Sequence, residues 1–377
     1  MHSGALDFNL AQIDAAPNAQ LQSVSLFGRC FGPRPPQLPT PNPNPMQSRL
    51  GLDFGFLPSY LLGSLLAMSL GARPPRSVLS SLYSALDYTD HLRLTESSLG
   101  YTTTASLTPD NLDANRYRDI LAYDHALLPG PYLNAAFVPP FHPTSLSFIA
   151  SQAPLPSTYT AFYTHIVEHG VRVLVNLTPL VEKGRTKAHQ YWPAEDADMV
   201  LENGWKLTCK PATRIQLENG EATLERRTIL IKPGEEAAEG LNAHGWGVTQ
   251  FHLTSWPDHG VFPTAMMMQL MREIQLVPMP KIYPPPPTWI HCSAGVGRSG
   301  TLAAALIAQA VINVSKHSNH EDRDALPLFM RAEADSQVWD LPVRIVEHLR
   351  RYRARMVQTL EQFEAIFDIV HHLSTPP

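Results

Sequence analysis

The spacing of hydrophobic and polar residues divides the chain into an irregular N-terminal part and a patterned remainder. Seven prolines lie between positions 33 and 45, and proline supplies no N–H to a helix or a sheet. The pattern becomes typical of a globular domain from about residue 78. We therefore predict a proline-rich, largely disordered N-terminal extension over residues 1–77 and one folded domain over residues 78–377.

Within that domain, segments with strand and helix patterns are interleaved without strict alternation. Runs rich in β-branched and aromatic residues predict strands at 132–138, 171–177, 223–231 and 248–254. Helical spacing predicts helices at 157–170, 264–276, 301–314 and 359–372. Ser157 and Gly170 mark the ends of the first helix, and Thr359 with Gln362 forms a capping box at the last. This order favours an α+β domain built on a mixed sheet.

An uncharged stretch of 19 residues, from Phe54 to Ala72, is a candidate membrane segment. Its length approaches the ~20 residues with which a helix spans a bilayer. Pro58 and several glycines and serines interrupt the stretch, however. We expect a helix or loop that packs on the domain, or partial disorder, rather than a membrane span.

Composition narrows the class of protein. The chain of 377 residues is 44% hydrophobic and 17% charged, which allows a sizeable core. A net charge of −5 argues against a general nucleic-acid binder. The three cysteines, Cys30, Cys209 and Cys292, have no paired spacing, and no signal peptide is visible. We expect a reducing compartment, the cytoplasm or also the nucleus.

The stretch HCSAGVGRSGT at 291–301 permits two chemical interpretations. Gly295, Gly297 and Gly300 form the G-x-G-x-x-G pattern of a dinucleotide-binding loop. That pattern requires an acidic residue about 20 positions further on, at the end of a second strand. Glu321 has the spacing, but its polar neighbourhood is not that of a buried parallel strand. The dinucleotide interpretation is therefore disfavoured.

The second interpretation starts from Cys292 and Arg298. A tight loop from Ser293 to Ser299 can turn successive backbone N–H groups inward and bind an anion. The N-terminus of the following helix adds positive potential at the same place. Arg298 can hold two phosphate oxygens, and these fields favour the thiolate form of Cys292. The stretch then predicts a nucleophile in a phosphate-binding loop.

A zinc-peptidase pattern also occurs, in HIVEH at 165–169. His165 and His169 lie one helical turn apart, as in H-x-x-E-H enzymes. The sequence offers no clear third ligand, so we interpret the segment as a structural helix.

The stretch HCSAGVGRSGT resembles, almost residue for residue, the signature of the tyrosine-specific protein phosphatases of non-receptor type. The resemblance covers roughly residues 110–372, with further motifs in the family's order: NRYRDILAYD, YLNAAFV, FIASQAPLP, VEKGRTKAHQYWP, TSWPDHG and MVQTLEQF. It implies one catalytic domain with a central, highly twisted mixed β-sheet flanked by helices. It also implies hydrolysis of phosphotyrosine through a cysteinyl-phosphate intermediate, without a metal or other cofactor.

The resemblance assigns roles to five catalytic residues. Cys292 attacks phosphorus and Arg298 binds the phosphoryl oxygens. Asp258 protonates the leaving phenolate and then accepts a proton from the attacking water. Ser299 stabilises the thiolate as the intermediate breaks down, and Gln358 positions the water.

Substrate-binding roles follow in the same way. Tyr117 stacks on the substrate ring and Asp119 holds the peptide backbone, whereas Arg118 either meets acidic residues beside the phosphotyrosine or is merely solvated. Lys187 contacts Asp258 when its loop closes, and Gln362 either assists Gln358 or serves only as a cap. The phosphoryl group is bound by the loop residues Ser293, Ala294, Gly295, Val296 and Gly297. Three residues support the site: His291, Trp256 and Glu182. Of these, Glu182 pairs with Arg298.

The sequence departs from the family pattern at a few positions. Ala114 replaces a lysine, and Ala153 replaces the glycine of a Q-G-P motif, which questions the local backbone. Phe262 stands between Val261 and Pro263, where the family runs directly from valine to proline, and this changes the hinge of the Asp258 loop. Four prolines at 284–287 predict an exposed loop before the catalytic strand.

Two other functional classes remain open. One is a catalytically inactive phosphotyrosine-binding module, which the intact Cys292, Asp258 and Arg298 disfavour. The other is a dinucleotide-dependent oxidoreductase. The favoured interpretation predicts phosphotyrosine proteins as partners, among them kinases of signalling pathways. It predicts that neither nucleic acid nor a membrane is a partner. It also predicts that the protein is a monomer.

Overall fold

A mixed β-sheet organises the part of the chain that the structure describes. The computed structural model describes residues 73–194, 197–220, 222–234, 245–256, 261–317 and 341–375. In this part the sheet has nine strands in the order β1-β2-β11-β3-β10-β9-β7-β6, and β8 pairs with β9. The centre, from β2 to β10, is parallel, and the flanking pairs are antiparallel. The predicted α+β class with a mixed sheet is confirmed.

The neighbouring strands β9 and β10 are the longest of the sheet, with 11 and 8 residues, and the others have two to five residues. The sheet comprises β1 (Ala135–Val138), β2 (Phe148–Ser151), β3 (Val173–Asn176), β6 (Met199–Val200), β7 (Lys206–Cys209), β8 (Thr213–Leu217), β9 (Ala222–Lys232), β10 (Trp246–Leu253) and β11 (Thr288–His291). A separate hairpin joins β4 (Val181–Glu182) to β5 (Arg185–Thr186).

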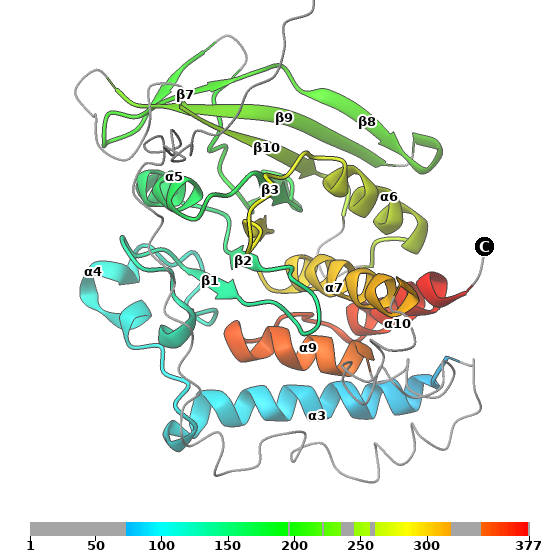
Figure 1. Cartoon of the computed structure of the whole chain (residues 1–377). Helices are drawn as coiled ribbons and strands as arrows, with labels where there is room; N and C mark the ends of the chain where they lie inside the picture. Colours follow the sequence, from blue (N-terminus) through cyan, green and yellow to red (C-terminus); the bar gives the residue numbers. More distant parts are fainter. Residues whose placement is uncertain are drawn as a thin grey trace, which may run out of the picture. The chain divides into compact units, whose positions relative to one another are not determined.

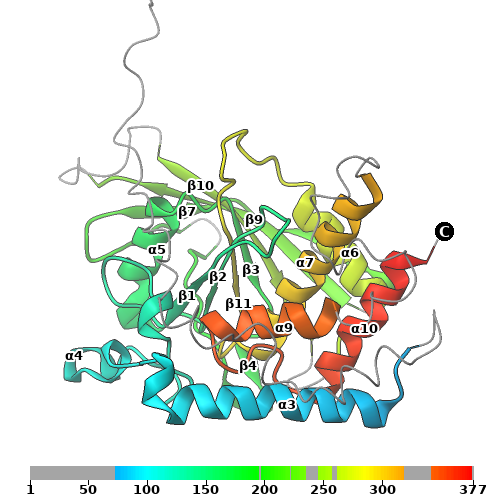
Figure 2. The same cartoon turned by 60° about the horizontal axis from the view of Figure 1, so that its bottom comes forward.

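Helices flank the centre of the sheet on two sides (Figure 1). They are α3 (Arg76–Thr95), α4 (Pro109–Leu112), α5 (Tyr159–Glu168), α6 (Thr264–Gln275), α7 (Gly297–His317), α9 (Leu341–Tyr352) and α10 (Leu360–Ser374). Helix α5 lies on one side of the sheet, and α6, α7 and α10 lie on the other. Helix α3 runs along α9 and α10 in both views (Figure 2).

Alternation along the central strands explains why both faces are covered. In β3, Val173 and Val175 enter the core that contains α7, whereas Leu174 enters the core that contains α5. In β11, Ile290 and Trp289 divide in the same way. Strands that are apolar on both faces are typical of a parallel sheet between helical layers. The arrangement places the carboxyl end of β11 at the start of α7.

Most predicted elements are present, with shifted ends. The four predicted strands correspond to β1, β3, β9 and β10, and the four predicted helices to α5, α6, α7 and α10. The cap of α5 is Thr158, so the prediction of Ser157 was wrong by one residue, because a 3-10 turn over Pro156–Thr158 precedes the helix. Gly170 has a φ of 69° just after α5, as expected of a residue that ends a helix.

The first described helix begins two residues before the boundary predicted at residue 78. Helix α3 begins at Arg76, and Arg73 and Arg76 form ion pairs with carboxylates of α10. Of the extension predicted over residues 1–77, residues 1–72 lie outside the described residues, including Cys30 and the uncharged stretch 54–72. In the described segments, no helix is both long and apolar enough to cross a membrane.

Candidate active site

The site is built on the loop between β11 and α7. The carbonyl oxygen of Ser293 accepts a hydrogen bond from the N–H of Ala153 at 2.9 Å, which ties the loop to the end of β2. Gly295 has a φ of 73°, and a Cβ there would lie 2.0 Å from the carbonyl oxygen of Ser151. Only glycine fits this approach. Ala153 does not have a positive φ, so alanine is accommodated in place of the family's glycine.

Cys292 lies at the base of the loop. Its side chain is only 5% exposed, and the N–H of Gly295 points at Sγ from 3.3 Å. Helix α7 begins at Gly297, so its N-terminus faces the same sulfur. A backbone N–H and a helix N-terminus both stabilise a thiolate. The loop and the helix thus place a backbone donor and positive potential beside Sγ of Cys292.

Arg298 is held in place from behind. Its guanidinium is buried and donates from Nη1 to Thr178 Oγ1 at 2.8 Å and to the carbonyl oxygen of Leu177 at 3.2 Å. Nη2 lies 3.1 Å from both carboxylate oxygens of Glu182, which projects from the β4–β5 hairpin. The predicted contact between Glu182 and Arg298 is present. Thr178, which follows β3, was not predicted from the sequence.

His291 is part of a buried hydrogen-bond chain. Gln250 donates to the hydroxyl of Tyr191 at 2.7 Å, and that hydroxyl lies 2.7 Å from Nε2 of His291. The hydroxyl then donates to Nε2, so the ring proton sits on Nδ1, 3.1 Å from the carbonyl oxygen of Cys292. Burial lowers the pKa of His291 to about 3. His291 is therefore a neutral ring that supports the loop.

An open pocket of about 180 Å³ leads down to Cys292. Pockets for drug-sized ligands span roughly 300–1,000 Å³, so this one suits a single side chain. Ten predicted residues line it: Tyr117, Asp119, Lys187, Cys292, Ser293, Ala294, Gly297, Arg298, Gln358 and Gln362. Ile120 also lines the pocket and was not predicted. Its apolar side chain follows the NRYRD motif directly, which is the signal that could have revealed it.

Tyr117 forms a wall of this pocket. Its hydroxyl lies 2.7 Å from Ser293 Oγ, and Ser293 donates in turn to the carbonyl oxygen of Lys187 at 2.6 Å. These bonds join three separate parts of the sequence at the rim. Asp119 lies at the same rim, 69% exposed and 3.3 Å from Nη1 of Arg355, whereas Arg118 is exposed.

Gln358 approaches the loop from the α9–α10 connection, and Gln362 from the first turn of α10. The side chain of Thr359 accepts from the N–H of Gln362 at 3.2 Å, as the predicted capping box requires. The side chain of Gln362, however, accepts from the N–H of Gln358 rather than from that of Thr359. The side chain of Gln362 thus binds the residue before the cap, Gln358, and links the two glutamines.

The remaining predicted residues lie around this centre. Ser299 is fully buried, and its hydroxyl has no hydrogen-bond partner among the described residues. Trp256 is buried and stacks on Phe262 at 5.1 Å between ring centroids, so the additional phenylalanine packs against this tryptophan. Val296 and Gly295 belong to the loop backbone. Asp258 lies outside the described residues, as does Glu321 of the dinucleotide interpretation.

Arg353 is a functional candidate that sequence reasoning missed. Its guanidinium is fully buried and donates to the carbonyl oxygens of Ala294 at 2.8 Å and Gly295 at 2.9 Å, and to Asn134 Oδ1 at 2.9 Å. Holding these carbonyls behind the loop turns the N–H groups toward Cys292. Burial lowers the pKa of Arg353 to about 10, so it keeps its charge at neutral pH. Nothing in the local sequence distinguishes it from neighbouring arginines.

The zinc pattern has a structural explanation. His165 lies in α5, with Nε2 2.8 Å from the carbonyl oxygen of Pro131, and its ring stacks on His169. Across the segments with described coordinates, no three His, Cys, Asp or Glu residues are arranged to hold a metal ion.

Gly300 has a structural role too, because a Cβ there would lie 2.3 Å from the N–H nitrogen of Val357. Gly295 and Gly300 thus serve close backbone packing, whereas Gly297 leaves room for the side chains of Gln358 and Gln362.

A thiol beneath an anion-binding loop, beside a buried arginine, defines a cysteine-dependent phosphoryl-transfer site. Comparison with known proteins agrees with this class. Residues 111–372 match the family described as protein-tyrosine phosphatase, and the chain belongs to this family.

Several relatives illustrate the match. The chain is 31% identical over 281 residues to human receptor-type tyrosine-protein phosphatase zeta, which covers 72% of this chain and 11% of the relative. It is 30% identical over 278 residues to mouse tyrosine-protein phosphatase non-receptor type 4, which covers 72% and 26%. The chain thus spans about a tenth to a quarter of the length of these two relatives.

A solved structure shows the same fold. The catalytic domain of human protein tyrosine phosphatase non-receptor type 18 superposes with a TM-score of 0.64 and 23% identity, over 79% of this chain and 97% of that one. The predicted single catalytic domain with a twisted mixed sheet flanked by helices is confirmed.

Proposed function

We propose that this chain hydrolyses phosphotyrosine in proteins through a cysteinyl-phosphate intermediate. The observation that carries the proposal is the geometry at Cys292, where Sγ receives the N–H of Gly295 at 3.3 Å beside the buried guanidinium of Arg298. A thiolate in this position can attack phosphorus while the loop N–H groups and Arg298 hold the phosphoryl oxygens.

The reaction proceeds in two displacements. Sγ of Cys292 forms a bond to phosphorus, the bond from phosphorus to the tyrosine oxygen breaks, and Asp258 gives its proton to the leaving phenolate. A water molecule positioned by Gln358 then attacks phosphorus and gives a proton to the Asp258 carboxylate. The P–S bond breaks, which releases inorganic phosphate and restores the thiolate with the help of Ser299.

Selectivity for tyrosine follows from the depth of the pocket. The ring of Tyr117 stacks on the substrate ring, while Ser293, Ala294, Gly295, Val296 and Gly297 bind the phosphoryl group. Phosphoserine is too short to reach Sγ past Tyr117. A related fold supports the substrate class, since protein tyrosine phosphatase non-receptor type 18 has been solved in complex with HER2 phosphopeptides.

The proposal also covers the substrates, the oligomeric state, the cellular location and the domain bounds. We propose phosphotyrosine proteins of signalling pathways, including kinases, as substrates, a monomeric state, and a cytoplasmic or nuclear location. Residues 1–77 would form a proline-rich extension and residues 78–377 the catalytic domain.

Turnover of para-nitrophenyl phosphate and of a phosphotyrosine peptide, both in EDTA, tests the proposal. We expect both substrates to be hydrolysed by the full chain. Cys292→Ser should reduce turnover to background while the peptide still binds, because the anion-binding loop remains. Cys209→Ser in β7 is the matched control and should keep full activity. Peptide binding without hydrolysis by the unchanged chain would indicate a phosphotyrosine-binding module instead.

A further inference from the structure

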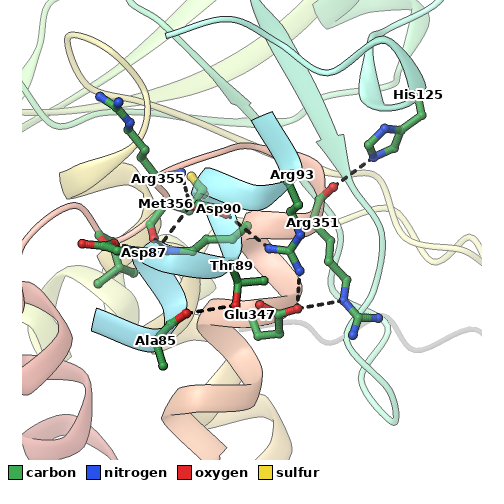
Figure 3. Close-up of polar contacts among 12 residues, drawn as sticks. Ala85, Asp87, Thr89, Asp90, Arg93, His125, Glu347, Arg351, Arg355 and Met356 are labelled. Atoms are coloured by element: carbon green, nitrogen blue, oxygen red, sulfur yellow. Dashed lines mark hydrogen bonds and ion pairs between the residues drawn. The ribbon is translucent and has the colours of Figure 1, made fainter. Parts of the chain in front are cut away.

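Helix α3 presents two carboxylates to an arginine of α9. Asp87 lies 2.7 Å and Asp90 3.4 Å from Nη1 of Arg350. Arg350 is fully buried and Asp90 is 4% exposed. Figure 3 shows both aspartates on α3, facing the segment that follows α9. A buried arginine with two carboxylates is fixed in orientation, because each alternative position would leave a charge unpaired.

Arg350 uses its other donors on the backbone before Gln358. Nε donates to the carbonyl oxygen of Met356 and Nη2 to that of Val357, each at 2.9 Å. Asp90 acts on the same segment directly, because its Oδ2 accepts the N–H of Arg355 at 2.8 Å. Three successive residues are thus held by one cluster of charges.

The segment they hold is strained. Arg355 has a φ of 61° and Val357 a φ of 62°. A positive φ is unfavourable for a side chain with a Cβ, and most of all for a β-branched residue such as valine. Strain of about 1–3 kcal/mol per residue persists only where the surroundings fix the backbone. The hydrogen bonds from Arg350 and Asp90 are contacts that do so.

The strained bend ends at a pocket residue. The N–H of Val357 donates to the carbonyl oxygen of Val296 in the loop at 3.1 Å, and the next residue, Gln358, lines the pocket. A change in the bend would therefore move the Gln358 side chain relative to the loop. Cys292 and Arg298 are positioned by other contacts, from β11, α7 and the β4–β5 hairpin.

We propose that Asp90 is a positioning residue for the second chemical step. It acts through Arg350 and through the N–H of Arg355 to fix the bend at 355–357, and thereby the place of Gln358 beside the cysteinyl phosphate. The inference rests on the proposed function. Residue 90 lies outside the matched residues 111–372, so the matched segment depends on α3 for this contact.

The test separates the two steps in rapid-quench and stopped-flow measurements with para-nitrophenyl phosphate. In Asp90→Asn, we expect hydrolysis of the intermediate to slow about 10-fold, as a small misplacement of a positioned group can cause. The rate of its formation should change less than about 2-fold. The fraction of enzyme trapped as cysteinyl phosphate at steady state then rises. Asp87→Asn, at a carboxylate that is 53% exposed, should shift this fraction in the same direction by less.

Asp368→Asn is the matched control. It removes an ion pair to Arg73 just before α3 and touches nothing in 355–357, so both steps should keep their wild-type rates. Equal slowing of both steps in Asp90→Asn, or no slowing, would overturn the inference. If Asp90→Asn does not fold, unchanged partitioning in Asp87→Asn overturns it instead. No phosphoenzyme in wild type or any variant would contradict the proposed function itself.

Discussion

The carbonyl oxygen of Gly295 accepts a hydrogen bond of 2.9 Å from the fully buried guanidinium of Arg353, which reaches the loop from the end of α9. The opposite side of the same residue points its N–H at Sγ of Cys292. Gly295 is therefore held by Arg353 through its carbonyl oxygen while its N–H group faces Cys292. Arg353 supports the backbone of the loop and is not among the residues that line the pocket.

Arg353→Met should impair catalysis although Arg353 is buried behind the loop and does not line the pocket. The carbonyl oxygens of Ala294 and Gly295 would lose a charged donor in a buried place, which costs about 1–3 kcal/mol for each unsatisfied group. We expect kcat/KM for para-nitrophenyl phosphate to fall about 100-fold and inhibition by inorganic phosphate to weaken. Arg272→Met, on the exposed side of α6, is the control and should leave both unchanged. Wild-type phosphate inhibition in Arg353→Met would show that the loop does not need this support.

Asp258→Ala should reveal the role of the predicted acid. We expect turnover of a phosphotyrosine peptide to fall by about 10²–10⁴, the range for loss of a general acid. The loss should be smaller for an activated phenyl ester, whose leaving group requires little protonation. Parallel kcat measurements on both substrates check this. An equal loss on both would point to a structural role for Asp258.

Two substitutions of Tyr117 separate its ring from its hydroxyl. Tyr117→Phe keeps the ring and removes only the bond to Ser293, which retains the carbonyl of Lys187 as a partner. We expect kcat/KM for a phosphotyrosine peptide to stay within about 3-fold. Tyr117→Ala should lower it about 10-fold, since aromatic contacts contribute roughly 0.5–1.5 kcal/mol. Rates on phosphoserine peptides should stay near background throughout, and a high rate in wild type would contradict the deep-pocket account.

Buried and half-buried histidines should make the stability of the fold sensitive to acid. Burial lowers the pKa of His291 to about 3 and those of His169 and His348 to about 4. Unfolded histidine titrates near 6.5, so the unfolded state binds more protons between pH 6.5 and 4. The free energy of unfolding should therefore fall as pH falls through this window, by up to about 1.4 kcal/mol per pH unit for each histidine.

Chemical denaturation of His348→Gln at pH 6.5, 5 and 4 checks this dependence. The variant should lose stability less steeply than wild type, because one titrating group is gone. His372→Gln, at an exposed position, is the control and should follow wild type. Identical slopes for His348→Gln and wild type would show that His348 does not contribute.

The sequence predicted the part of the site whose residues lie close together along the chain. Cys292, the glycines and Arg298 lie within eleven consecutive residues, and the short spacing itself implies a loop that binds an anion. The supporting contacts are different, because their partners lie far apart in the chain. Arg353 pairs with Asn134 across 219 positions, and Asp87 with Arg350 across 263. No periodicity links such residues.

Among the described helices, α3, α4 and α9 were missed, and α3 shows a related reason. The buried face of α3 carries Leu79, Leu82 and Leu86 but then continues with Asp90 and Arg93, so its apolar pattern stops halfway. Helix α9 differs, because it buries Ile345, Val346 and Leu349 in regular helical spacing beside the charged Arg350. Where a fold buries ion pairs, hydrophobic spacing underestimates the length of a helix. Helices α3 and α9 supply the contacts that bear on Gln358.

Trapping the covalent intermediate tests the central claim most directly. The full chain is mixed with a phosphotyrosine peptide, quenched in acid within milliseconds, digested and analysed by mass spectrometry. We predict one phosphate on the peptide that contains Cys292, present in wild type, increased in Asp258→Ala with an activated ester as substrate, and absent in Cys292→Ser. Phosphate on any other residue, or rapid turnover with no phosphate on Cys292 at any quench time, would contradict the account.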